Sequence, residues 1–391
     1  MTTLPLGRVI DLQTTKADRA NDFKVGLEHI EAKTGRLIDA EADYTGDGVA
    51  FEPDDVLFGK LRPYLAKVWC ADRPGNAVGD FHVYRPRPGL VDPRYLIYAL
   101  LSDSFIGPVT SSVYGAKMPR ASWDFIRTLA IHLPPLEHQS RLAGYLDRET
   151  AQIDALIAKQ EQLIATLRER RAGVIAQEAL REFDPLDPSG TSGPSLGTVF
   201  DVSLGKMLDA KKEPGSEDLR LPYVRAANIQ DDGLDLLDVN RMWFSPAEAA
   251  RLDIRDGDLL VVEGGAVGTT VLVNESMPGW SFQKTVNRVR ATSDWSTAWL
   301  RYVLRAYRDV GIIDLICDGS TIAHLTAEKL RALRIPPIAP GDQQRIVNFL
   351  DATTAKIDAL IAKAERFIEL SKERRAALIT AAVTGQLNIP V

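Results

Sequence analysis

The chain has 391 residues, of which 45% are hydrophobic, and a formal net charge of −6. This size and hydrophobic content predict two or three domains with substantial cores. The acidic charge argues against a globally basic nucleic-acid-binding protein. The presence of only two cysteines argues against a disulfide framework and fits a reducing compartment. No apolar run approaches the ~18 residues of a membrane span, and the N-terminus lacks a basic-then-apolar leader, so we expect a cytoplasmic protein with no membrane contact.

Residues 1–134 form the first predicted domain. Residues 54–70 alternate and are rich in β-branched and aromatic side chains, which predicts two strands. Residues 79–87 predict a further strand, and the apolar spacing that starts at Asp92 predicts a buried helix. Residues 111–120 have the composition of an exposed basic loop, and a short helix and a strand should follow it. The mixture indicates an α+β domain.

A long helix is predicted over residues 135–184. Prolines at 134 and 135 suit its first turn, and its apolar residues recur every three or four positions. A helix of this length, about 65 Å for ~43 residues, is not stable alone in water, so its apolar stripe requires a partner helix. The residues predicted to form the coiled-coil seam, on this helix and on a second one near the C-terminus, are Ile153, Leu156, Leu163, Leu167, Ile357, Leu360 and Phe367.

The rest of the chain repeats this order after a Pro/Gly/Ser-rich linker at 185–194. Residues 195–338 form the second predicted domain, in which PSLGTVFDV echoes LPLGRVIDL and WLRYVLRAY echoes YLIYALLSD. Residues 339–391 hold the second long helix and a C-terminal tail. Its segment DATTAKIDALIAKAERFIELSKERRA matches DRETAQIDALIAKQEQLIATLRERRA, 204 positions earlier, at 16 of 26 positions without a gap. The chain is therefore an internal duplication.

The order domain, helix, domain, helix defines the predicted fold class. We expect an α+β chain with two globular domains separated by two long α-helices, which pack as an antiparallel coiled coil. An internal pseudo-twofold repeat should relate the two halves. The scaffold segments repeat while the loops diverge.

Complete motifs for catalysis are absent from the sequence. The run Gly264-Gly265-Ala266-Val267-Gly268 lacks GxGxxG spacing and fits a turn between strands better than a phosphate cradle. The five histidines show no zinc-finger spacing with the two cysteines. We therefore predict no catalytic residue, no metal site and no cofactor bound by this chain.

Residue types suited to DNA contact gather in the divergent loops and in two nearby strands. Arg and Lys suit guanine edges and phosphates, whereas Asn suits adenine. Solvated turns and strand faces are the plain alternative, and His324 in particular fits either role. The candidate DNA-binding residues are Lys60, Arg62, Tyr64, Lys67, Tyr114, Lys117, Arg120, Gly265, Lys284, Asn287, Arg288, Ser320, Thr321 and His324.

The sequence Glu-Arg-Arg recurs near the end of each long helix. It interrupts the apolar stripe, so it indicates either a solvated helix end or a docking site for a partner protein. The candidate docking residues are Arg170, Arg171, Arg374 and Arg375.

The chain resembles, over essentially its full length, the specificity (S) subunits of type I restriction-modification systems. The resemblance rests on the two domains separated by repeated helices. It also rests on IHLPPLEHQSRLAGYLD and IPPIAPGDQQRIVNFLD, which are similar to the family's I-P-L-P-P-L-x-E-Q-x-x-I-x-x-x-L-D pattern, and on the ending AAVTGQLNIPV. The sequence departs from the pattern at His132 and in PPIAPGDQ, both just before a helix begins.

The resemblance implies a non-catalytic DNA reader. Each globular domain would be a target recognition domain for one half of a split double-stranded DNA sequence. The helices would set the spacing of the halves and dock two methyltransferase (M) subunits, and restriction (R) subunits would complete the complex. S-adenosylmethionine and ATP/Mg would belong to those partner subunits.

Two other classes of function remain as hypotheses. The near-neutral domains also fit a scaffold that binds two protein partners. A stand-alone nuclease or methyltransferase is disfavoured because no motif for either activity is complete.

Overall fold

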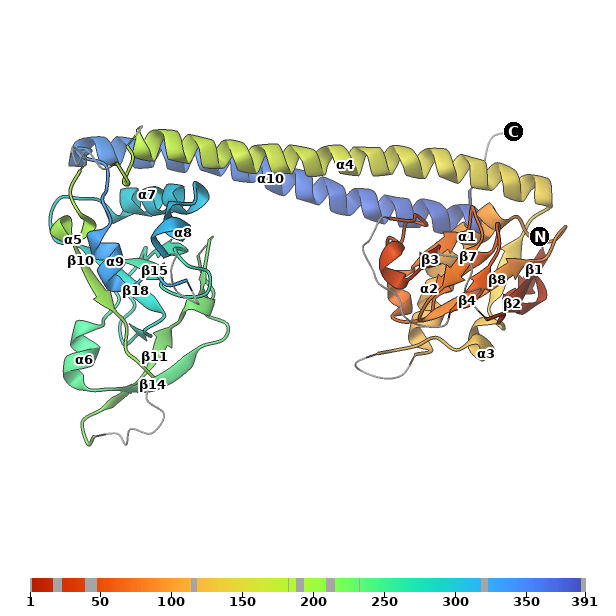
Figure 1. Ribbon diagram of the computed structural model, residues 1–391, viewed down its shortest axis with the longest axis horizontal. Coiled ribbons are helices and arrows are strands. Elements are labelled where there is room, and N and C mark those ends of the chain that lie inside the picture. Colours follow the sequence, from red (N-terminus) through yellow and green to blue (C-terminus); the bar gives the residue numbers. More distant parts are fainter. Residues whose placement is uncertain are drawn as a thin grey trace. The chain divides into compact units, whose positions relative to one another are not determined.

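The computed structural model describes residues 2–16, 23–38, 48–113, 118–181, 183–187, 193–208, 215–231, 233–317 and 323–387. It divides into two compact units. Unit 1 comprises Met1–Gln162 with Ala364–Val391, and unit 2 comprises Leu163–Lys363. Both long helices continue from one unit into the other, so each unit contains a globular part and portions of two helices (Figure 1).

A four-stranded antiparallel sheet forms the centre of unit 1. Its strand order is β2-β8-β5-β6. The strands are β2 (Ile10–Gln13), β8 (Phe81–Pro86), β5 (Val56–Gly59) and β6 (Val68–Cys70). A second sheet contains β3 (Lys24–Val25), β7 (Gly75–Ala77) and β4 (Val49–Phe51), and β1 (Thr2–Pro5) pairs with β9 (Ala130–Leu133). The strands predicted within residues 54–70 and 79–87 are thereby confirmed.

Helix α1 of unit 1 joins the main sheet to the long helices. Asp92 caps its N-terminus by accepting hydrogen bonds from the amides of Arg94 and Tyr95, which explains why the helix begins there. One buried cluster contains α1 residues together with Leu146 of the first long helix and Ile379 of the second. The helical elements of this unit are η1 (Leu6–Arg8), η2 (Leu27–His29), η3 (Pro63–Leu65), α1 (Pro93–Leu101), α2 (Asp103–Ser111) and α3 (Trp123–Ile126).

The main sheet of unit 2 repeats that of unit 1. Its antiparallel order β10-β18-β15-β16 uses β10 (Phe200–Leu204), β18 (Val286–Ala291), β15 (Leu259–Val262) and β16 (Thr270–Leu272). The smaller sheet differs, because here β11 (Leu219–Val224) is central, between β14 (Asn240–Phe244) and β17 (Ser281–Phe282). A short pair, β12 (Ile229–Gln230) and β13 (Gly233–Leu234), completes the unit.

Helix α7 takes the place of α1 in unit 2. Its fully buried Trp299 belongs to a cluster that also contains Ile175 and Leu350 from the two long helices, so α7 lies between the sheet and the helix pair (Figure 1). The helical elements are α5 (Leu196–Val199), η4 (Ala226–Asn228), α6 (Pro246–Arg251), α7 (Thr297–Asp309), α8 (Ile312–Cys317) and α9 (Ala327–Ala332). The α+β class is confirmed in both units.

The long helices are α4 (Leu136–Leu180) and α10 (Pro340–Val383). Each begins with a buried glutamine that ties it to its domain. Gln139 Oε1 accepts a hydrogen bond from the Asp92 amide at 2.9 Å, and Gln343 Oε1 accepts one from the Ser296 amide at 2.8 Å. These glutamines lie in the segments that carry the family resemblance. No helix among the described residues is long and apolar enough to cross a membrane.

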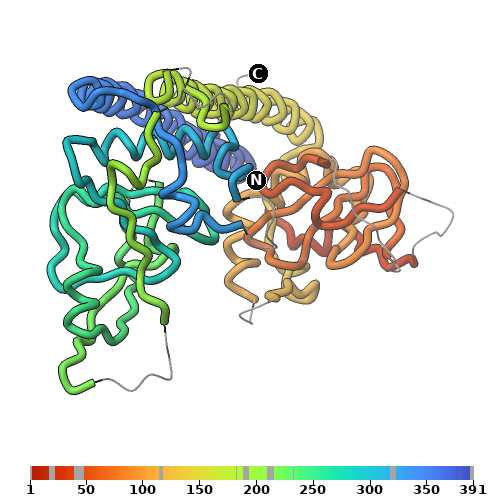
Figure 2. The backbone as a smooth tube through the Cα atoms, turned by 60° about the vertical axis from the view of Figure 1, so that its left-hand side comes forward, coloured from red at the N-terminus to blue at the C-terminus, as the bar shows by residue number. Residues whose placement is uncertain are grey.

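The two long helices run antiparallel (Figure 2). In unit 1 Asp154 of α4 forms an ion pair with Arg375 of α10 at 3.0 Å, and in unit 2 Arg171 of α4 forms one with Asp358 of α10 at 3.1 Å. As the residue number rises along α4, its partner's number falls along α10. Both pairs use the same two repeat positions, since 154 and 358, like 171 and 375, differ by 204.

The predicted seam is partly wrong. Ile153, Leu167 and Ile357 are buried as expected. The other predicted seam residues, Leu156, Leu163, Leu360 and Phe367, are each more than 40% exposed. Two paired helices bury chiefly the a and d positions of a heptad, and these four residues occupy the flanking g position. The seam also includes Ile157, Ile164, Ile361 and Ala364, all buried.

Candidate nucleic-acid interface

The loop that joins β5 to β6 presents the most accessible candidates of unit 1. Arg62 and Ala66 adopt left-handed backbone conformations, with φ of 49° and 44°, and the short helix η3 lies between them. Residue 120 pairs with Leu61, and the Arg62 amide donates to Pro119 O at 2.9 Å, so the segment around Arg120 holds this loop in place. Arg62 and Tyr64 remain exposed.

Asp80 forms ion pairs with two cationic side chains beside this loop. Its carboxylate accepts hydrogen bonds from Arg120 Nε at 3.0 and 3.1 Å and lies 3.8 Å from Lys60 Nζ. Burial, together with the charge of Lys60, lowers the pKa of the neighbouring His82 to about 4. The imidazole is therefore neutral at physiological pH. One surface of unit 1 therefore combines three cationic side chains with an exposed tyrosine: Lys60, Arg62 and Arg120, with Tyr64.

Lys67 has a structural contact. Its ammonium donates a hydrogen bond to Leu27 O at 2.6 Å, which ties the end of the loop to η2. The side chain is half-buried. Tyr114 and Lys117 lie outside the residues that the structure describes.

The corresponding place in unit 2 is the turn between β15 and β16. Gly264 pairs with His324, and Gly265 is exposed with a φ of +92°, which favours glycine. Lys284 is exposed, and both Lys284 and His324 act electrostatically on Glu263. Burial raises the pKa of the Glu263 carboxyl, and these two neighbours partly offset that rise. Ser320 and Thr321 lie outside the described residues.

Two candidates in β18 are buried, so the prediction that they contact DNA is wrong. Asn287 donates a hydrogen bond to Leu325 O at 3.0 Å, and Arg288 donates to Arg251 O at 3.0 Å and Asp253 O at 2.8 Å. The physical reason is that other segments cover both faces of the sheet at β18. Successive side chains point to opposite faces, and Asn287 lies against the segment at Leu325 whereas Arg288 lies against the end of α6 and the residues that follow it.

The four arginines of the repeated Glu-Arg-Arg motif divide into two pairs. Arg170 and Arg374 are exposed. Arg375 is buried, and its guanidinium contacts Asp154 as well as the carbonyl oxygens of Lys33 and Thr34. The docking prediction is therefore wrong for Arg375, because its donors are already used inside unit 1. Arg171 is half-buried and forms its ion pair with Asp358.

Sequence reasoning missed a second set of arginines in unit 2. Arg301, Arg305 and Arg308 of α7 lie, with Arg171, around one cavity. Their spacing of four and then three residues places them on one helix face, and this signal was present in WLRYVLRAYRD. The described residues contain no cluster of three or more His, Cys, Asp or Glu side chains that could hold a metal ion.

Comparison with known proteins agrees with the resemblance predicted from sequence. No family model matches the chain. It is 21% identical over 287 residues to the EcoBI specificity subunit of a type I restriction enzyme from Escherichia coli, which covers 67% of this chain and 59% of that protein. It is 27% identical over 188 residues to the EcoKI specificity subunit from Escherichia coli strain K12, 46% of this chain and 39% of that protein. The chain therefore spans less than two thirds of the length of the curated relatives it matches.

Solved structures show the same fold. A chain from a study of complex assembly and conformational transition of the type I R-M system aligns over 99% of this chain and 98% of its own length, with a TM-score of 0.70 and 20% identity. The HsdS subunit from Thermoanaerobacter tengcongensis aligns over 99% and 97%, with a TM-score of 0.55 and 19% identity. In sequence and in fold, the chain is thus similar to the specificity subunits of type I restriction enzymes.

Proposed function

We propose that this chain is the DNA-specificity subunit of a type I restriction-modification complex. The observation that carries the proposal is a repeated scaffold with divergent side chains at one place. In unit 1 the turn after β5 pairs with Arg120, and in unit 2 the turn after β15 pairs with His324. Residues 120 and 324 are 204 positions apart, so they occupy the same position of the repeat. Each unit would read one half of a split double-stranded DNA target.

The two surfaces differ in the contacts they offer to DNA. Unit 1 presents Arg62, Tyr64 and Arg120, which suit phosphates and guanine edges. Unit 2 presents Lys284 and His324 beside the exposed Gly265, where the missing side chain lets a nucleic-acid backbone approach closely. Different chemistry on one framework is what a reader of two unlike half-sites requires.

Helices α4 and α10 would set the spacing of the half-sites and dock two methyltransferase (M) subunits. The g-position residues Leu156 and Leu163 on α4, and Leu360 and Phe367 on α10, expose apolar surface at seven-residue intervals along each helix. An exposed apolar stripe of this kind fits packing against a further helix. The exposed Arg170 and Arg374 would lie at the polar rim of these contacts.

The chain would contribute no catalysis. Adenine methylation with S-adenosylmethionine would belong to the M subunits, and ATP/Mg-dependent cleavage would belong to restriction (R) subunits. The purified chain alone should therefore show no methyl transfer to DNA with S-adenosylmethionine, and measurable turnover by the chain alone would contradict this division of labour.

Single-molecule methylation mapping tests the proposal. The full chain is expressed with its methyltransferase subunit in a host without other DNA methylation, and the methylated motif is read from the genome. A split adenine-methylation motif is expected. The double variant Arg62→Ala with Tyr64→Ala should relax only one half of that motif, and His324→Ala should affect only the other half. A methylated motif that is unchanged in both variants would point instead to a scaffold for two protein partners.

A further inference from the structure

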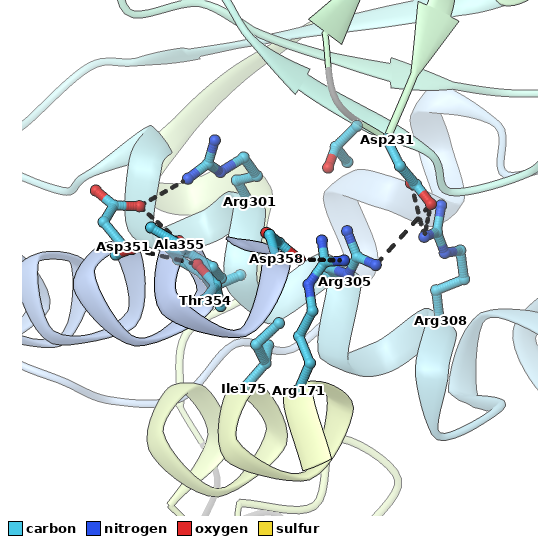
Figure 3. A pocket seen from close by; sticks show the side chains of 12 residues that line it. Arg171, Ile175, Asp231, Arg301, Arg305, Arg308, Asp351, Thr354, Ala355 and Asp358 are labelled. Atoms are coloured by element: carbon cyan, nitrogen blue, oxygen red, sulfur yellow. Dashed lines mark hydrogen bonds and ion pairs between the residues drawn. The ribbon is translucent and has the colours of Figure 1, made fainter. Parts of the chain in front are cut away.

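A charged cavity of about 220 Å³ opens within unit 2, between α7 and the long helices (Figure 3). Four arginines line it: Arg171 from α4, and Arg301, Arg305 and Arg308 from α7. The facing carboxylates are those of Asp231, Asp351 and Asp358. The lining therefore carries four positive and three negative charges, and Asp309, just outside the lining, lies near Arg305 and Arg308.

Two of the four guanidinium groups are incompletely paired. Arg308 donates to Asp231 at 2.8 and 3.0 Å, and Arg301 donates to Asp351 at 3.0 Å. The carboxylates nearest to the Arg305 guanidinium are those of Asp309, at 3.6 Å, and Asp231, at 3.9 Å, and both distances exceed hydrogen-bond length. Among the described residues, the buried Nε atoms of Arg305 and Arg171 have no hydrogen-bond partner. Buried donors without acceptors are costly, so the cavity favours an added acceptor.

Burial and neighbouring charge act in the same direction on Arg305. Burial, with the like charge of Arg171 next to it, lowers the pKa of the Arg305 guanidinium. Two cations held close together in a partly enclosed space are stabilised by an anion between them.

Unit 1 shows how the equivalent place is filled. Arg375 occupies the repeat position of Arg171, and it donates to Lys33 O at 2.7 Å and to Thr34 O at 3.1 Å. The next residue of this loop, Gly35, packs against Ile97 and Leu101, the repeat positions of Arg301 and Arg305. A peptide segment of the chain itself therefore covers the site and supplies the acceptors.

The corresponding loop of unit 2 is two residues shorter. In unit 1 the pairing of Ile30 with Leu37 encloses residues 31–36, whereas in unit 2 the pairing of Ile229 with Leu234 encloses residues 230–233. Among the described residues of the shorter loop, Asp231 accepts hydrogen bonds from Arg308 and acts on Arg171 only through its charge. Of the residues that the structure describes, none fills in unit 2 the place that the loop of unit 1 occupies.

We propose that this cavity receives a segment of a partner protein that presents a carboxylate to Arg171 and Arg305. The inference rests on the proposed function, because the partner is the methyltransferase subunit. A peptide fits better than DNA for two reasons. A peptide segment fills the site in unit 1, and the half-exposed Asp231, Asp351 and Asp358 at the rim would repel a phosphate backbone while accepting donors from a protein.

Binding of the full chain to its methyltransferase subunit tests the proposal. Arg305→Leu, which places the unit 1 residue in the cavity, should weaken the complex by about tenfold or more through loss of a charge-assisted contact. Arg171→Met should weaken it similarly. Arg241→Leu, which removes an exposed arginine from β14, is the matched control and should bind as the wild type does. Circular dichroism on each variant confirms that the chain is folded.

A double-mutant cycle identifies the acceptor. Each acidic residue of the methyltransferase subunit is replaced by its amide, alone and against Arg305→Leu. One replacement should weaken binding to the wild type but cause no further loss with Arg305→Leu.

Three results would overturn the inference, and they are distinguishable. Wild-type affinity in both variants would show that the cavity takes no partner residue. Normal assembly with weakened DNA binding, and a shallower salt dependence, would assign the cavity to a DNA phosphate. If the wild-type chain fails to bind the methyltransferase subunit at all, the proposed function falls and the inference with it.

Discussion

Two neighbouring residues of α10 provide a sharp test of the helix pair. Leu360 is 49% exposed and Ile361 is 8% exposed, although both are apolar and lie one position apart. Glutamine is a good helix former, so Leu360→Gln and Ile361→Gln leave helix propensity largely unchanged. Ile361→Gln should lower the free energy of unfolding by about 2–4 kcal/mol, because it removes buried apolar surface and brings an amide into the seam. Leu360→Gln should stay within about 1 kcal/mol of the wild type.

The two variants should behave in the opposite way toward the partner. Leu360→Gln removes an apolar contact from the outer face, so we expect it to weaken binding to the methyltransferase subunit while the urea-unfolding midpoint stays unchanged. Binding is measured by calorimetry on the full chain and unfolding by circular dichroism. Equal destabilisation by both substitutions would refute the assignment of the seam. Normal partner binding by Leu360→Gln would refute docking on the outer stripe.

Three further results are expected. Arg375→Ala should cost about 2–4 kcal/mol of unfolding free energy, because it removes one of the two arginines that pair with Asp154 and takes the guanidinium donor from the carbonyl oxygens of Lys33 and Thr34, whereas Arg374→Ala should be nearly neutral in the same urea titration. Arg62→Ala should weaken DNA binding by the assembled complex and reduce the slope of log K against log salt by about 1, and an unchanged slope would remove Arg62 from the phosphate contacts. The folded pKa of His82, about 4, lies below its unfolded value near 6.5, so the wild type should lose on the order of 3 kcal/mol as the pH falls through that window. The His82→Gln variant should lack this loss in unfolding experiments between pH 7 and 4.

The duplication made much of the fold predictable. Matching segments placed α4 and α10, and alternation located β5, β6 and β8. The seam was predicted less well, because apolar residues at three- and four-residue spacing fill the g positions as well as a and d. Leu156 and Ile157 are indistinguishable in that pattern, and only the number of helices in the bundle decides which of them is buried.

The exposure of the candidate DNA-binding residues was predictable where a loop carries the residue. Arg62 and Tyr64 lie in a turn, and the structure leaves both exposed. Asn287 and Arg288 have equally suitable chemistry, but other segments cover their side chains. Which segments pack on each face of a sheet depends on contacts distant in sequence, so residue type alone could not separate these two cases.

The repeats also show which contacts the fold retains and which it changes. Tyr98 donates to Asp147 at 2.6 Å and Tyr302 donates to Asp351 at 2.5 Å, so each domain is fixed to its long helix by the same hydrogen bond. The buried glutamines at the two helix starts repeat a second such contact. Between these fixed points the loops differ in length and charge. Because the anchors do not depend on the loops, a loop can change its DNA contacts or its partner contacts without moving the domain on its helix.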